Sequence, residues 1–179
     1  MKKHLIVGAA VFAAVVTGEV QAEPPAQVQA CVECHGADGV SDSPAWPNLA
    51  GQHETYLAQQ LKAMRSGERN NALMAPFVTD LSDEDIQVLA AWYSSQEASV
   101  AANGDAKQVE RGRELAGACS ACHGYNGKPV ADEWPILAGQ HAAYLQTQLF
   151  GYKHAVRIHP FMQAAVEALD EEDFSALAA

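Results

Sequence analysis

All four cysteines of this 179-residue chain fall into two short motifs, Cys31-Val32-Glu33-Cys34-His35 and Cys119-Ser120-Ala121-Cys122-His123. Each motif has the pattern C-x-x-C-H, the attachment signal of c-type haem. Its two thiols form thioethers with the haem vinyl groups, and the adjacent histidine binds the iron. A zinc site or a thioredoxin-like dithiol would also pair cysteines, but neither explains the two histidines. The sequence therefore predicts two covalent haem c groups, held by Cys31, Cys34, Cys119 and Cys122, with His35 and His123 on the irons.

The two motifs lie 88 residues apart, and the residues that follow them repeat with the same spacing. When Cys31–Ala91 is laid on Cys119–Ala179 without a gap, 25 of 61 positions are identical. Such self-similarity indicates an internal duplication, hence two homologous domains in tandem. Each unit has about 75 residues, which is small for a self-sufficient core, and a covalent haem would fill that core.

The second axial position of each iron decides between electron transfer and ligand binding or catalysis. Met74 and Met162 occupy the same position of the repeat, 43 residues after the first cysteine of their motif. Core methionines are the alternative reading. However, Met64 pairs with Tyr152 in the repeat, so it cannot supply a ligand common to both domains. We therefore predict His35 and Met74 on the first iron, and His123 and Met162 on the second.

The remaining histidines are weaker candidates for ligands. His53 and His141 are repeated, but each directly precedes an expected helix, so we interpret them as hydrogen-bonding residues with a backbone or propionate partner. His154 and His159 have Ser66 and Asn71 as repeat partners and are expected on the surface or in loops. The repeated aromatic residues are either core residues or donors to a haem propionate; these are Trp46, Trp134, Tyr56 and Tyr144.

The chain shows few strand signals, and its apolar periodicity predicts an all-α fold. Expected helices in the first half are Pro25–Cys34, Glu54–Ser66 and a helix capped by Ser82 that runs to about Ser95, with a loop over Leu73–Asp80. Those of the second half are Lys107–Cys122, Ala142–Lys153 and Glu171–Ala179. The second half ends at the partner of Ala91 and lacks a counterpart of Trp92-Tyr93. Either the chain is truncated there or the second domain closes differently.

The N-terminus reads as an export signal, with a basic start, an apolar stretch over Leu5–Val16 and small residues before Glu23. An uncleaved anchor is the alternative, although the stretch is short for a membrane span. We predict a signal peptide over 1–22, cleaved near Ala22, domain 1 over 23–97, a linker over 98–105 and domain 2 over 106–179. Haem c is attached outside the bacterial inner membrane, so the mature protein is expected in the periplasm.

The formal net charge is −11, which argues against binding to nucleic acid. This charge is unequally shared, with a net −8 over 23–97 and a net −3 over 106–179. Ordinary solubility and a role in docking are both open explanations.

Taken together, the motifs resemble those of the cytochrome c4 family of periplasmic dihaem cytochromes. The resemblance covers nearly all of the mature chain and rests on three features. These are the two C-x-x-C-H-G motifs, the repeated W-P-x-L-A-G-Q-H-x-x-Y-L segment, and Met74-Ala75-Pro76 followed by Leu81-Ser82-Asp83-Glu84-Asp85-Ile86. It implies two class I cytochrome c domains related by a pseudo-twofold axis, His/Met ligation in each, and haem edges that face one another across the domain interface.

The resemblance further implies an electron carrier rather than an enzyme, working between a membrane electron donor complex and a terminal oxidase or reductase. Peripheral association with the membrane is compatible with this role. The alternative is a dihaem subunit of a larger redox enzyme such as a flavocytochrome. A dihaem peroxidase fits less well, because it needs one accessible iron and both domains here offer a methionine.

Overall fold

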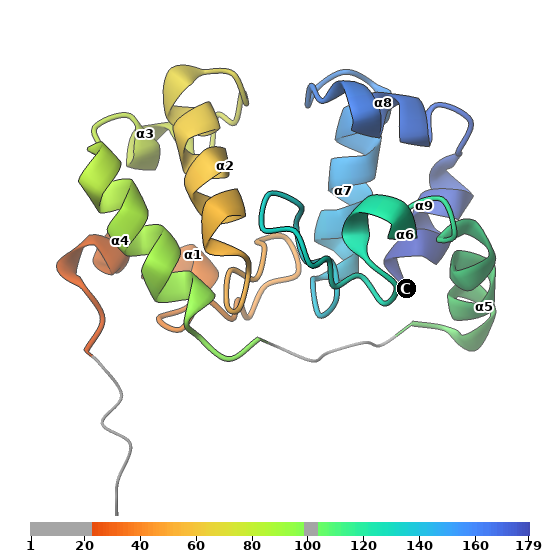
Figure 1. Cartoon of the computed structure of the whole chain (residues 1–179), viewed down its shortest axis with the longest axis horizontal. Coiled ribbons are helices and arrows are strands. Elements are labelled where there is room, and N and C mark those ends of the chain that lie inside the picture. Colours follow the sequence, from red (N-terminus) through yellow and green to blue (C-terminus); the bar gives the residue numbers. More distant parts are fainter. Residues whose placement is uncertain (1–22, 99–103) are drawn as a thin grey trace, which may run out of the picture.

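The computed structural model describes residues 23–98 and 104–179, and within these ranges it contains helices and no strands (Figure 1). The first half consists of the 3₁₀ helix η1 (Ala26–Ala30) and the helices α1 (Val32–His35), α2 (Glu54–Ser66), α3 (Ala75–Val78) and α4 (Asp83–Ser94). The second half consists of α5 (Ala106–Leu115), α6 (Ser120–His123), α7 (Ala142–Lys153), α8 (Pro160–Val166) and α9 (Glu171–Ala178). This confirms the all-α prediction. The predicted signal peptide and positions 99–103 of the predicted linker lie outside the described residues.

In the first domain, α4 packs against α2. The helix begins with a capping box, in which the Ser82 side chain accepts from the Asp85 backbone N–H and the Asp85 carboxylate accepts from the Ser82 N–H. Its buried side chains recur at helical spacing, at Ile86, Leu89, Ala90 and Tyr93, and form one face. The predicted Ser82 cap and the acidic first turn of this helix are confirmed.

In the second domain, α9 takes the place of α4 and has its own capping box, formed by Asp170 and Asp173. It packs against α7 and also against α5, for which the first domain has no counterpart of similar length. Gly112 on α5 permits this close approach, because a Cβ atom there would lie 2.1 Å from the Ala176 carbonyl oxygen. The contact between the first and last helices is therefore more extensive in the second domain than that of η1 with α4 in the first.

Some predicted boundaries are wrong. The expected helix over Pro25–Cys34 is broken at Cys31 into η1 and α1, and the one over Lys107–Cys122 is interrupted between Leu115 and Ser120. The expected loop over Leu73–Asp80 contains the short helix α3, and α8 was not predicted. Both begin with a proline at the first or second position, where its missing N–H costs nothing. None of the helices over 23–98 and 104–179 is long and apolar enough to cross a membrane.

Candidate haem sites

The histidine of each motif lies buried at the end of a single helical turn. His35 is 6% exposed and His123 is 7% exposed. The Nδ1 atom of His35 lies 2.9 Å from the Pro47 carbonyl oxygen, and that of His123 lies 3.1 Å from the Pro135 carbonyl oxygen. Because a carbonyl only accepts, each Nδ1 carries the proton and each Nε2 keeps a free lone pair. This is the tautomer and orientation in which histidine binds a metal.

Burial also favours the neutral, ligating form of these imidazoles. It lowers the pKa of His35, against the opposing effect of the Pro47 carbonyl. Burial likewise lowers the pKa of His123, and the nearby His159 adds to this lowering, against the opposing effect of the Pro135 carbonyl. His159 is therefore a neighbour of the haem motif, which the sequence did not indicate.

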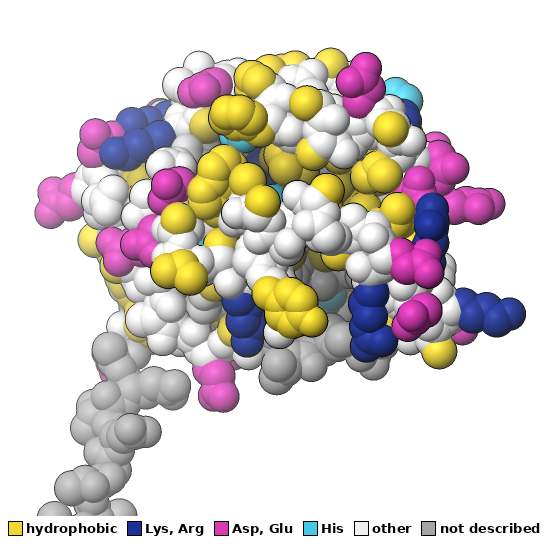
Figure 2. All heavy atoms as spheres, turned by 45° about the vertical axis from the view of Figure 1, so that its right-hand side comes forward, with side chains coloured by type: hydrophobic (Ala, Val, Ile, Leu, Met, Phe, Trp, Pro, Cys, Tyr) yellow, Lys and Arg dark blue, Asp and Glu magenta, His cyan; other side chains and the backbone are white. Residues whose placement is uncertain are grey.

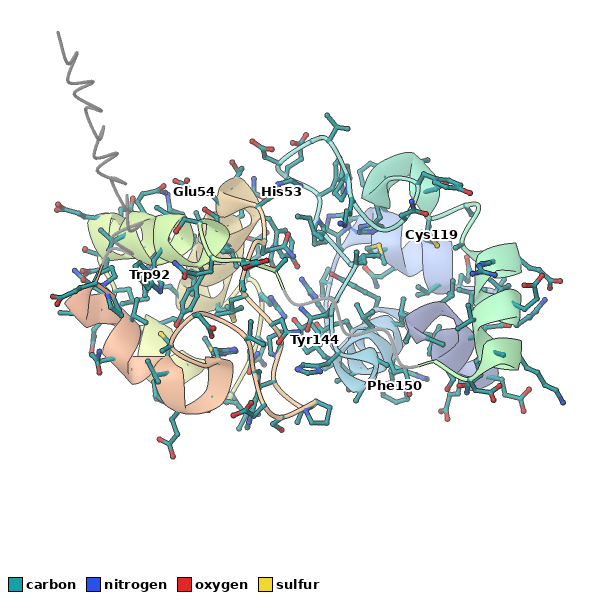
Figure 3. The ribbon with its side chains drawn as sticks, turned by 90° about the horizontal axis from the view of Figure 1, so that it is seen from below. His53, Glu54, Trp92, Cys119, Tyr144 and Phe150 are labelled. Carbon is teal, nitrogen blue, oxygen red and sulfur yellow. The ribbon has the colours of Figure 1, made fainter. Side chains whose placement is uncertain are left out.

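The glycine after each motif has a structural reason. Gly36 and Gly124 have φ values of 79° and 73°, and a Cβ atom would lie 2.3 Å from the Val40 carbonyl oxygen or 2.2 Å from that of Lys128. The chain thus turns sharply away after each histidine, and the four cysteines stay beside the two imidazoles on α1 and α6 and at their starts. Figure 3 shows Cys119 at this place in the second domain.

The predicted methionines also lie at matching places. Met74 directly precedes α3, and Met162 lies in the first turn of α8. Met162 packs against the buried cluster formed by Tyr152, Val166 and Phe174. Both methionines are half-buried.

Two glutamines join the domains by symmetric hydrogen bonds. Gln52 donates to the Ile136 carbonyl at 2.9 Å and accepts from the Ile136 N–H at 2.8 Å. At the repeated position, Gln140 makes the same pair of bonds with the backbone of Asn48, at 2.9 and 2.8 Å. Because each contact is matched by its repeat partner, the interface has the pseudo-twofold character of an isologous contact.

The repeated histidines belong to the same interface. The Nε2 atom of His53 lies 3.2 Å from the Pro129 carbonyl oxygen, and that of His141 lies 3.0 Å from the Ser41 carbonyl oxygen. This confirms the prediction of backbone-bonded histidines, and Figure 3 shows His53 and Tyr144 near the boundary between the two halves. Because Nε2 of each histidine is bonded to a carbonyl of the other domain, neither histidine is oriented to bind an iron.

Two arginines at matched positions converge on this boundary. Arg69 and Arg157 both donate to Gln60 Oε1, at 2.9 and 2.8 Å, and both donate to Gln148 Oε1, at 3.2 and 2.7 Å. Each also donates to a phenol of the opposite domain, Tyr144 or Tyr56. Among residues 23–98 and 104–179, no carboxylate lies within ion-pair distance of either guanidinium.

These donors give an independent test of whether the residues fit a haem. The buried Tyr93 hydroxyl, close to Cys31, has no hydrogen-bond partner among the described residues. Burial raises the pKa of Tyr93, so the hydroxyl keeps its proton. An unmatched buried donor and two cations without a counter-ion suit a ligand with anionic oxygens, such as haem propionates.

The sequence prediction missed the interface glutamines and arginines. Gln52, Gln60 and Arg69 are identical to their repeat partners Gln140, Gln148 and Arg157. Polar identity between the two halves was therefore the available signal. It could not be assigned to an interface, because the sequence alone does not orient one domain against the other.

Known proteins support the same architecture. The family model described as "Cytochrome C oxidase, cbb3-type, subunit III" matches residues 26–92, and the one described as "Cytochrome c" matches residues 109–179. A cytochrome c4 of Pseudomonas aeruginosa is 36% identical over 167 residues, which cover 85% of this chain and 82% of the relative. This chain belongs to the cytochrome c4 family.

Further relatives agree with this membership. The crystal structure of reduced recombinant cytochrome c4 from Pseudomonas stutzeri matches with a TM-score of 0.80 and 34% identity, over 85% of this chain and 92% of that one. A thiosulfate dehydrogenase electron acceptor of Thiomonas intermedia is 36% identical over 149 residues, covering 76% of this chain and 68% of the relative. As a member of this family with two cytochrome c domains, the protein carries two covalently bound haem c groups and serves electron transfer.

Proposed function

We propose that the protein is a periplasmic electron carrier in which His35 and Met74 ligate the first haem iron, and His123 and Met162 the second. Bound haem supplies an iron that takes up and releases one electron. The observation that carries the proposal is the match between the domains, each with a buried, carbonyl-oriented histidine and a methionine at the start of the short helix before the last. Two closed irons leave electron transfer as the activity.

The protein's own residues hold the two redox centres in a fixed relation. The glutamine pairs, the interface histidines and the two arginines tie α2, α7 and the loops before them together. We propose that Arg69 and Arg157 also bind haem propionates, which would supply the anions that the protein does not. Such a fixed arrangement keeps the distance between the haems constant, as rapid transfer between them requires.

The partners are proposed to be a membrane electron donor complex and a terminal oxidase or reductase, with peripheral membrane association compatible with this role. A second candidate is favoured by the similarity to a thiosulfate dehydrogenase electron acceptor, namely that the protein is the electron-accepting partner or subunit of a larger redox enzyme. Purification from the native periplasm separates the two. A monodisperse dihaem protein supports the free carrier, whereas stoichiometric co-purification of a second redox protein supports the subunit.

The ligands are tested by optical spectroscopy of the ferric protein. A methionine–iron bond gives a weak far-red charge-transfer band, and Met74→Leu and Met162→Leu should each remove about half of it. Met64→Leu, which alters a half-buried methionine outside the proposed ligand set, should leave the band unchanged. If the band persists in full in either ligand variant, that ligand assignment is wrong.

A further inference from the structure

The two domains differ in the residue three positions before the proposed methionine ligand, whose side chain accepts from the methionine backbone N–H. In the second domain it is His159, whose Nδ1 accepts from the Met162 backbone N–H at 3.4 Å. In the first domain Asn71 stands at this position, and its Oδ1 accepts from the Met74 N–H at 3.2 Å. Both side chains hold the methionine backbone, but only His159 brings a nitrogen that can bind a metal.

His159 lies in the loop that leads into α8, as the sequence suggested, but its side chain faces the motif of the second domain. Its ring centroid lies 6.3 Å from that of Trp134 and 6.4 Å from that of Tyr152, both in edge-on contacts. Trp134 also meets the motif histidine His123 edge-on, at 6.5 Å. One aromatic cluster therefore joins the proposed methionine segment to the motif histidine.

Within residues 23–98 and 104–179, no other histidine is free to play this part. His53 and His141 have their Nε2 atoms bonded to carbonyls across the interface. His154 is exposed and stacks on Phe150 at 4.2 Å between centroids. The Nε2 atom of His159, by contrast, has no hydrogen-bond partner among the residues the structure describes.

We propose that His159 is a reserve ligand for the second haem, which binds the iron through Nε2 when the Met162 sulfur is lost. This inference rests on the proposed assignment of Met162. Imidazole is a good ligand of iron. Binding through Nε2 requires the ring proton to reside on Nδ1, and the only bond given up is the long one from the Met162 N–H.

The two domains then respond differently to the same loss. Without the Met74 sulfur, Asn71 offers no replacement, so the first haem opens to external ligands. Without the Met162 sulfur, the second haem stays six-coordinate with two histidines. Since a methionine ligand raises the potential relative to such a pair, the second haem falls in potential and remains closed.

The test uses the full dihaem protein, reduced and exposed to carbon monoxide. Before carbon monoxide is added, the reduced Met74→Ala protein should show one high-spin ferrous haem, whereas Met162→Ala should stay low-spin. On exposure, Met74→Ala should bind about one carbon monoxide per protein and Met162→Ala almost none. Met74→Leu and Met162→Leu keep the apolar volume and should repeat this contrast if an alanine variant folds poorly. His159→Asn/Met162→Ala, which places at this position the residue type of Asn71 in the first domain, should bind carbon monoxide as Met74→Ala does.

Two results would overturn the reserve ligand. One is a Met162 variant that binds carbon monoxide as fully as the Met74 variant, and the other is a double variant that remains low-spin. Failure of the underlying methionine assignment looks different, because Met162→Leu would then keep its full far-red band in the ferric state.

Discussion

The two domains carry the same haem motif but bury hydrophobic clusters of different size. The first buries seven apolar residues in one cluster, made of Val28, Leu57, Ala58, Ile86, Leu89, Ala90 and Tyr93, whereas the second buries three, Tyr152, Val166 and Phe174. The two duplicated domains therefore have buried clusters of different size.

The second domain also exposes more large apolar side chains than the first. The second domain exposes six large apolar side chains, Tyr125, Val130, Phe150, Val156, Ile158 and Phe161, and the first exposes only Leu73 and Phe77 among the described residues. Figure 2, with the second domain turned forward, shows apolar side chains across the middle of the face and charged ones mostly at its margins. At four of those six positions the first domain has Asp42, Lys62, Glu68 and Asn70.

The largest expected effect comes from removing one haem at a time. Cys119→Ala/Cys122→Ala should abolish haem retention in the second domain and unfold most of it, because three buried residues make a small core. Cys31→Ala/Cys34→Ala should leave the first domain with more of its helix content. Haem staining of fragments cut near Gly104 and circular dichroism of both variants measure this. Equal loss of helix would contradict the difference between the domains.

A smaller effect is expected where α5 meets α9, a contact that is more extensive than its counterpart between η1 and α4 in the first domain. Gly112→Ala places a Cβ atom 2.1 Å from the Ala176 carbonyl oxygen and should destabilise the second domain by about 1–3 kcal/mol. Gly117→Ala is the matched control, since nothing lies within 4 Å of its Cβ position. Thermal unfolding followed in the second haem's absorption should show a lowered midpoint only for Gly112→Ala. An unchanged midpoint would mean that α5 does not support α9.

The interface should respond nearly equally from its two sides. Gln52→Ala strands the Ile136 N–H and carbonyl, and Gln140→Ala strands those of Asn48, so each should weaken docking by about 1–3 kcal/mol. Exposed Gln87 provides a control, Gln87→Ala. Small-angle scattering and the coincidence of the two domains' unfolding transitions report docking. A loss confined to one variant would show that the two sides of the pseudo-twofold interface contribute unequally to the free energy of docking.

The sequence-based predictions succeeded for local features and failed for features that depend on packing. The haem motifs, the capped helix after Ser82 and the helices α2 and α7 were predicted because spacing and capping are local properties. The breaks at Cys31 and after Leu115 were missed, since a helical pattern continues through both. The interface of Gln52, Arg69 and their partners depends on how one domain meets the other, which no local pattern encodes. His159 does lie in a loop, as its repeat partner Asn71 suggested, but its contacts with Trp134 and Tyr152 depend on tertiary packing.

The smallest expected effect is the order of the two haem potentials. Ferric haem carries one more positive charge than ferrous haem, so nearby negative charge favours the oxidised form and lowers the potential. Residues 23–97 carry a net −8 and residues 106–179 a net −3, so the first haem should have the lower potential. These charges are mostly exposed and screened over about 8–10 Å, which keeps the difference modest. Hydrogen bonds to the iron ligands change the potential by a similar amount.

A redox titration of the wild type and of Met162→His separates these contributions. A histidine at this position should selectively depress the second haem, which is the higher of the two wild-type potentials if charge sets the order. Repeating the wild-type titration at increasing salt should shrink the gap, because screening acts on exposed charge and not on ligand hydrogen bonds. If Met162→His moves the lower wild-type potential instead, the order is reversed. A gap that is also indifferent to salt would then show that the surroundings of the ligands, not the surface charge, order the pair.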